Sequence, residues 1–176
     1  MSIRYHPEMH DRTPWLDPRI DVAPSDIQGQ GLFARAAIAE GEVVVRLGGE
    51  VLTDEEFRVR IVNLKKYSAL AIDDGLNLLI GDDSPTTFGN HSCDANLWMA
   101  DAVTLIARRP IAAGEEVTVD YATHTADLAW SMTCNCGSPS CRQVVTHEDW
   151  RRPDVQARYA GHFSPFLNRR IAAARL

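Results

Sequence analysis

Asn90-His91-Ser92-Cys93 places an amide, an imidazole and a thiol on one short stretch of the chain. The amide both donates and accepts hydrogen bonds, and a cysteine thiolate is a soft metal ligand. Three motifs elsewhere in the chain can form one site only if the fold brings them to this stretch. They are the turn Gly29-Gln30-Gly31, the pair Asp120-Tyr121 and the cysteines Cys134, Cys136 and Cys141.

The cysteine spacing predicts a metal site. Cys134, Cys136 and Cys141 form a Cys-x-Cys-x4-Cys pattern, which gives three thiolates on one tight loop. Structural zinc takes four ligands, and Cys93 is the only other cysteine. If Cys93 supplies the fourth ligand, the metal fastens the C-terminal segment to the Asn90–Cys93 stretch. The alternative, four unpaired thiols, is disfavoured because three of them lie within eight residues.

Composition and charge limit the classes of function. The chain has 176 residues, a net charge of −6 and 45% hydrophobic residues, which is typical of one soluble globular domain. The acidic balance disfavours direct nucleic-acid binding. No apolar run approaches the ~18 residues that span a membrane, and residues 1–18 resemble no signal peptide. We therefore expect no membrane partner and an intracellular, cytoplasmic location, with the nucleus not excluded.

The charge is also uneven along the chain. Residues 146–176 carry six arginines against three acidic residues, so the excess of acid lies in residues 1–145. An acidic body can attract a basic partner. The alternative is that these are ordinary solvated surface charges.

Short strands dominate the predicted secondary structure. Strands are expected at Arg19–Val22, Leu32–Ala36, Val43–Val45, Leu76–Ile80, Leu97–Ala100, Val103–Ala107 and Glu116–Val119. Thr53 and Glu56 form a capping box that predicts a helix over Asp54–Asn63. Two more helices are expected at Pro153–Ala160 and Phe166–Ala174. This pattern predicts a β-rich (α+β) fold with short helices and a C-terminal helical segment.

The last predicted helix carries an apolar stripe of Phe166, Leu167 and Ile171. The favoured interpretation is that this stripe packs on the body of the chain. The alternatives are a homodimer contact or a flank of the substrate site.

Two distant segments of the chain have similar sequences. Residues 37–45 and 110–119 each show small residues, a glycine, a glutamate and then a β-branched strand. Gly41 and Gly114 suit a positive φ at the turn.

Two of the opening signals are weak when taken alone. Gly29-Gln30-Gly31 lacks the third glycine and the following helix of a dinucleotide fingerprint, so it is either an ordinary turn or a close backbone approach to a ligand. Tyr121 follows an apolar strand, so it is either a core residue or a phenol at a reaction centre.

Taken together, these motifs and their order closely resemble the SET-domain protein lysine methyltransferases with a post-SET zinc segment. The resemblance covers about residues 19–145. It implies a SET-type β-clip fold of several small sheets with a pseudoknot, in which the Asn90–Cys93 and Asp120-Tyr121 segments pass each other. The implied parts are an N-terminal arm (1–18), a SET domain (19–125), a post-SET zinc segment (126–145) and a C-terminal helical extension (146–176).

The resemblance also implies a reaction. S-adenosylmethionine would donate a methyl group to a lysine of a protein or peptide, with a basic segment expected, through a narrow channel. Tyr121 matches the catalytic tyrosine. The implied cofactor-binding residues are Gly29, Gln30, Gly31, Asn90, His91 and Tyr121, with a looser match at Tyr67. The implied zinc ligands are Cys93, Cys134, Cys136 and Cys141, holding one structural ion.

The sequence departs from the family pattern at several positions, and two of them bear on function. Leu47 stands where many members have a second channel tyrosine, and this supports an alternative in which the chain is a non-catalytic binding module. Thr123 stands where an aromatic residue is common, and its smaller size predicts room for di- or trimethylation. A second alternative is methylation of a non-protein amine.

Overall fold

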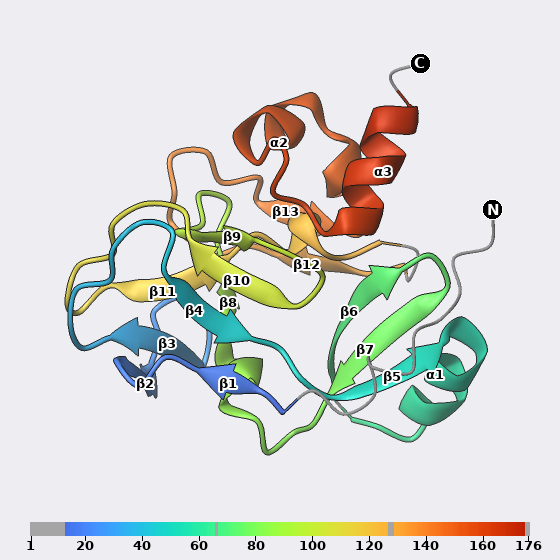
Figure 1. Cartoon of the computed structure of the whole chain (residues 1–176), viewed down its shortest axis with the longest axis horizontal. Helices are drawn as coiled ribbons and strands as arrows, with labels where there is room; N and C mark the ends of the chain where they lie inside the picture. The colour runs from blue at the N-terminus through green and yellow to red at the C-terminus, as the bar shows by residue number, and fades with distance from the viewer. Residues whose placement is uncertain (1–12, 66, 127–128, 175–176) are drawn as a thin grey trace.

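The structure is a computed structural model that describes residues 13–65, 67–126 and 129–174. The described residues form three sheets, with the C-terminal helices gathered on one side (Figure 1). The predicted β-rich architecture of several small sheets and few short helices is confirmed. None of the described helices has the length and apolar character needed to cross a bilayer.

The largest sheet contains most of the predicted strands. Its order is β1 (Trp15–Leu16), β4 (Val43–Arg46), β10 (Thr104–Ala107), β9 (Leu97–Met99), β11 (Glu116–Val119), β3 (Gln30–Ala34) and β2 (Ile20–Pro24), with β8 (Asn90–His91) paired to β11. Strands far apart in sequence are neighbours here. β11 therefore lies between β3, from the N-terminal part of the chain, and the strands β8 and β9 from its middle.

β11 is the strand that positions the site. It pairs in parallel with β8, where Val119 faces His91, and with β9. The buried Asn96 side chain completes this contact, because its Oδ1 accepts from Thr118 N at 2.8 Å and its Nδ2 donates to Glu116 O at 2.8 Å. The Asn90–Cys93 segment and the Tyr121 segment therefore lie side by side, as the expected pseudoknot requires.

The two segments with similar sequences contact each other directly. Ile38 and Ile111 exchange backbone hydrogen bonds of 3.0 and 2.9 Å in an antiparallel bridge. Gly41 and Gly114 have φ values of 83° and 85°, as their turns predict. The two similar segments thus stabilise each other across the sheet.

The second sheet is antiparallel and has the order β5 (Glu50–Thr53), β7 (Leu76–Ile80) and β6 (Ser68–Asp73). Helix α1 (Asp54–Ile61) follows β5 and begins with the predicted capping box, in which Thr53 Oγ1 accepts from Glu56 N at 3.3 Å. The helix ends two residues before the predicted Asn63. It buries only Phe57, so little packing extends it.

The third sheet is a hairpin of β12 (Ser131–Thr133) and β13 (Val144–Thr146), and the three clustered cysteines lie in its connecting loop. Three 3₁₀-helices punctuate the described chain: η2 (Pro85–Phe88), η3 (Tyr121–Thr123) and η4 (Asp149–Arg151). Tyr121 therefore stands where β11 turns into η3.

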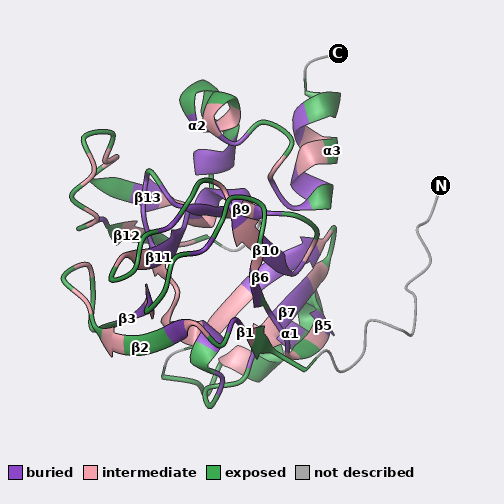
Figure 2. Ribbon diagram, turned by 60° about the vertical axis from the view of Figure 1, so that its left-hand side comes forward, coloured by how far each residue is buried: buried purple, intermediate pink, exposed green. Residues whose placement is uncertain are grey.

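The C-terminal helices α2 (Pro153–Arg158) and α3 (Pro165–Ala173) lie together on one side of the sheets, and α3 contacts β6 (Figures 1 and 2). Phe166, Leu167 and Ile171 are buried in one apolar cluster with Trp150 and Tyr159. The packing interpretation of the apolar stripe is confirmed. Its apolar face is covered within the chain, so the predicted homodimer would need another surface.

Candidate active site

The asparagine of the central stretch holds the glycine turn. Asn90 Nδ2 lies 3.2 Å from Gln28 O, 3.0 Å from Gln30 O and 2.8 Å from Glu116 Oε1. The same Glu116 carboxylate accepts from Ser25 Oγ at 2.9 Å. The turn before β3, the Asn90 side chain and the start of β11 therefore form one hydrogen-bonded unit.

Gly31 is required by this unit. A Cβ at Gly31 would lie 2.1 Å from Glu116 Oε1 and 3.1 Å from Asn90 Nδ2. The carboxylate cannot move away freely because Ser25 and Asn90 both hold it. Gly29 has a φ of 53°, in the left-handed region, so the backbone conformation, not a close contact, favours glycine there.

His91 lies between Tyr121 and Cys93 and contacts both. His91 is 1% exposed, and its Nδ1 accepts from Tyr121 N at 3.1 Å. Nε2 therefore carries the hydrogen, and it lies 3.3 Å from Cys93 Sγ. Burial lowers the pKa of His91 to about 4 against the opposing charge of Asp120, so the ring is neutral. Both ring nitrogens of His91 therefore already have a partner within the chain.

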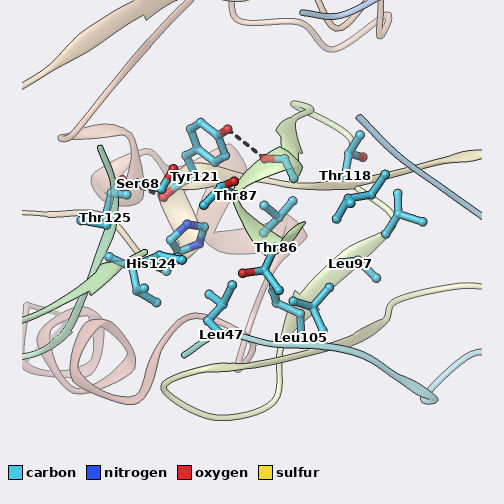
Figure 3. A pocket seen from close by; sticks show the side chains of 18 of the residues that line it. Leu47, Ser68, Thr86, Thr87, Leu97, Leu105, Thr118, Tyr121, His124 and Thr125 are labelled. Atoms are coloured by element: carbon cyan, nitrogen blue, oxygen red, sulfur yellow. Dashed lines mark hydrogen bonds between the residues drawn. The ribbon is translucent and has the colours of Figure 1, made fainter. Parts of the chain in front are cut away.

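Tyr121 has a fixed hydroxyl. Its Oη donates to Gly89 O at 2.9 Å, the contact drawn as a dashed line in Figure 3. Burial raises the pKa of the phenol to about 12, so it stays protonated at neutral pH. With its hydrogen committed to Gly89, the oxygen can only accept from a further ligand.

Tyr121 lines a cavity of about 330 Å³ (Figure 3). Among the described residues, no Asp, Glu, Lys or Arg lines it. Its walls come from the large sheet, from the β6–β7 sheet and from the segment before β12. They include Leu47, Tyr67, Leu105, His124, Trp130 and Met132. The cavity is thus a mainly apolar space with a few uncharged polar groups.

The structure refines two sequence predictions here. Leu47 and Tyr67 both line the cavity, and Tyr67 is 45% exposed with its ring edge against Phe57. Thr123 does not line it, because its buried hydroxyl turns back to Asp120 O at 2.7 Å. The expectation that the small Thr123 leaves room in the channel is therefore wrong, since its neighbour His124 faces the space instead.

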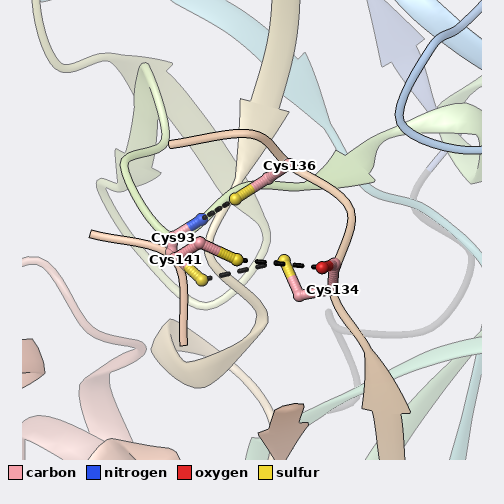
Figure 4. A group of neighbouring side chains, drawn as sticks. All are labelled: Cys93, Cys134, Cys136 and Cys141. Carbon is pink, nitrogen blue, oxygen red and sulfur yellow. Dashed lines mark hydrogen bonds between the residues drawn. The ribbon is translucent and has the colours of Figure 1, made fainter. Parts of the chain in front are cut away.

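The four cysteines converge, with Cys93 from the central stretch and the others from the β12–β13 loop (Figure 4). Their sulfur atoms all lie within 4.8 Å of one another, and Cys93 Sγ is 3.8 Å from Cys134 Sγ. A tetrahedral ion with Zn–S bonds of ~2.3 Å places its sulfurs roughly 3.8 Å apart. Four soft sulfur donors at this spacing fit zinc. Backbone N–H groups of Arg142 and Gln143 also approach Cys93 and Cys141 at 3.3 and 3.4 Å.

A family model described as a SET domain matches residues 29–122. The chain belongs to the SET-domain family. The matched range contains the glycine turn, the Asn90–Cys93 stretch and Tyr121. It ends before the cysteine loop and the C-terminal helices.

Two proteins with similar sequences are named as histone-lysine N-methyltransferases. The chain is 30% identical over 151 residues to histone-lysine N-methyltransferase ash1 of Drosophila melanogaster, covering 76% of this chain and 7% of that protein. It is 30% identical over 135 residues to the histone-lysine N-methyltransferase, H3 lysine-36 specific, of Debaryomyces hansenii, covering 69% and 18%. The chain thus spans less than a fifth of the length of these relatives.

A solved structure shows the same fold. The methyltransferase domain of human histone-lysine N-methyltransferase SETMAR superposes with a TM-score of 0.59 at 24% identity. The superposition covers 73% of this chain and 58% of that one.

One element of the site was not predicted from the sequence. Arg142, beyond the matched SET residues, is 3% exposed and donates from both terminal nitrogens to Asp120 at 2.7 Å. Its Nε lies 2.7 Å from an Asp149 carboxylate oxygen in η4. The arginine therefore ties the cysteine loop and the C-terminal extension to the residue preceding Tyr121. The sequence feature that could have identified Arg142 is its position directly after Cys141.

The extension also holds both paired segments of the SET domain. Tyr159 Oη accepts from Ala95 N at 3.2 Å, and the Arg158 side chain donates to Cys93 O. Ser164 N donates to Thr123 O at 2.7 Å. The C-terminal helices therefore support the site from outside the family match.

We expect Asp120→Asn to lower the free energy of unfolding by about 3 kcal/mol, because it leaves a buried arginine without its bidentate partner. Denaturant unfolding of the purified protein measures this change. Asp94→Asn is the matched control, since Asp94 is 55% exposed in its pair with Arg108 and should cost under about 1 kcal/mol. Equal losses for the two variants would contradict the assigned role of Arg142.

Proposed function

We propose that this chain is an S-adenosylmethionine-dependent protein-lysine N-methyltransferase. The observation that carries the proposal is a cavity without charged side chains among its described lining residues, lined by Tyr121 with its fixed hydroxyl, in a chain of the SET-domain family. The names of its relatives, which are histone-lysine N-methyltransferases, support the same reaction class.

The cavity suits the acceptor that this reaction needs. A lysine amine must be neutral to attack, yet its reference pKa is about 10.4. Apolar walls and the absence of a carboxylate among the described lining residues disfavour the ammonium form. In the transfer step the amine lone pair forms the N–C bond while the sulfonium C–S bond breaks, with its electron pair staying on sulfur. The resulting ammonium then loses its proton to solvent.

Tyr121 would orient the amine. Its oxygen has lone pairs directed away from the Gly89 contact and is held beside the cavity. An acceptor at this point fixes one amine hydrogen and so directs the nitrogen lone pair.

The glycine turn and the central stretch would hold the cofactor, which supplies an activated methyl group on a sulfonium. The fit rests on the hydrogen-bonded unit that joins the glycine turn to Asn90, directly after Gly89 in the chain. We assign Gly29, Gln30, Gly31, Asn90 and the backbone of His91 to it. Tyr67 and Tyr121 would meet it from the cavity side.

The four-cysteine site would hold one structural zinc ion. All four ligands come from the protein, so the tetrahedral site is closed and leaves no position for substrate. Within this proposal residues 19–125 act as the SET domain and 126–145 as the zinc segment. Reduced thiols also agree with the expected intracellular location.

The substrate would be a lysine in a basic protein segment, because the body of the chain is acidic. A non-catalytic binding module is the second candidate, and the absence of a tyrosine at Leu47 favours it. Methyl transfer separates these two candidates, because a binding module could also hold the cofactor.

The test uses methyl-labelled S-adenosylmethionine with lysine peptides and, in parallel, free polyamines. We expect label in the peptides and not in the polyamines. Cofactor binding without transfer to either would favour the binding module, and transfer to polyamines alone would favour a non-protein amine.

A further inference from the structure

We propose that Lys65 is a self-methylation site, and that its amine enters the cavity of its own chain and receives a methyl group when no peptide substrate is bound there. The proposal rests on the lysine methyltransferase function argued above. It adds an acceptor within the chain itself, and it makes Lys65 a competitor of the peptide for the cavity.

Lysine is rare in this chain and is confined to one place. Of the 18 lysine and arginine residues, only Lys65 and Lys66 are lysines, and they directly precede Tyr67. The arginine guanidinium stays protonated in proteins, so lysine is the basic side chain that can supply a neutral amine. Lys66 lies outside the described residues, whereas Lys65 is described. The only lysine side chains therefore lie next to a residue of the cavity.

The residues that follow Lys65 form the opening of the cavity. Tyr67 and Ser68 line the same cavity as Tyr121 (Figure 3). Tyr67 is 45% exposed, which makes it the most exposed of the described lining residues. A residue that faces both solvent and the cavity marks the place where the cavity opens. The chain therefore passes from Lys65 directly to this opening.

Lys65 lies within reach of the opening. It follows helix α1, where Leu64 N donates to Ile61 O at 2.9 Å in a turn. Two residues of chain span at most ~7 Å, so the Cα atom of Lys65 lies no further than this from the Cα atom of Tyr67. The lysine side chain adds a flexible four-carbon stem to this reach. The amine can therefore arrive at the opening while the sheets stay in place.

The Lys65 side chain is not held elsewhere. It is exposed, and it forms no ion pair or hydrogen bond with another described residue. Most of the described arginines differ, because they are paired with carboxylates. Arg60 of α1, for example, pairs with Glu50 of β5. No contact with the described part of the chain has to break before the Lys65 amine moves to the cavity.

The transfer step is the same as for a peptide lysine. The lone pair of the Lys65 amine forms the N–C bond, while the sulfonium C–S bond breaks and its electron pair stays on sulfur. The ammonium that forms loses one proton to solvent. Because the acceptor belongs to the same chain, the step is unimolecular once the cofactor is bound. Because both amines need the same cavity, a peptide substrate slows the reaction of Lys65.

The test incubates the purified full chain with methyl-labelled S-adenosylmethionine and no other acceptor, and locates the label by tandem mass spectrometry. We expect label on Lys65, at a rate per chain that does not change on dilution and that falls when a lysine peptide is added. Lys65→Arg should lose this label and still methylate the peptide. Lys66→Arg is the matched control and should keep the label on Lys65.

Two labelling results would overturn the proposal. One is label confined to Lys66, and the other is a rate per chain that falls in proportion to dilution, because one copy then methylates another. An unlabelled chain that methylates the peptide would also overturn it and would leave the proposed function intact. A chain that transfers methyl to neither acceptor would overturn the proposed function as well.

Discussion

Replacing Tyr121 with phenylalanine is expected to lower kcat for lysine methylation by about two orders of magnitude while cofactor affinity stays within a few-fold of wild type. The phenylalanine keeps the ring contact with His91 at 5.2 Å but removes the oxygen that orients the amine. Single-turnover kinetics measures the transfer step, and calorimetry measures cofactor binding.

Tyr159→Phe is the matched control for this variant. Tyr159 is buried, and its phenylalanine variant likewise loses one hydrogen bond, since the Tyr159 oxygen accepts from Ala95 N outside the cavity. Both variants should lose about 1 kcal/mol of stability. Only Tyr121→Phe should lose turnover, and equal kcat values for the two variants would remove Tyr121 from the reaction.

If the four-cysteine site holds zinc as proposed, Cys93→Ser is expected to abolish zinc binding and unfold the cysteine loop. Structural zinc sites of this type contribute about 10–16 kcal/mol of apparent binding free energy, which is also folding free energy. Elemental analysis should find about one zinc per wild-type chain and far less in the variant. Ser138→Ala is the control, because Ser138 lies in the same loop and its hydroxyl bonds within the loop to Ser140.

The loss of zinc should also weaken cofactor binding. His91 connects Cys93 to the backbone of Tyr121, and Arg142 connects the cysteine loop to Asp120. Removing the ion frees both connections, so calorimetry of the chelator-treated protein should show a higher Kd for S-adenosylmethionine. A zinc-free wild type with full cofactor affinity would contradict the coupling.

The local signals in the sequence were sufficient for much of the fold. The spans of β7 and β11 match their predicted ranges, and the capping box at Thr53 starts α1 as expected. β5 and β6 were missed because their sequences lack a clear apolar alternation. Their pairing with β7 depends on the tertiary fold and cannot be predicted from the sequence of either strand alone.

The convergence of the site was predictable from its unusual residue types, but its supporting contacts were not. The central stretch does meet the glycine turn, Tyr121 and the other cysteines. Arg142 escaped notice because a lone arginine is common in any chain. Its importance comes from burial and from the partners that the fold brings to it.

The most direct test of the account is to incubate the purified protein with methyl-labelled S-adenosylmethionine and a cell lysate, and to locate the label by tandem mass spectrometry. The account predicts label on lysine side-chain nitrogens of basic protein segments, absent with Tyr121→Phe. Label confined to other residues or to small molecules, or equal labelling by the Tyr121 variant, would contradict it.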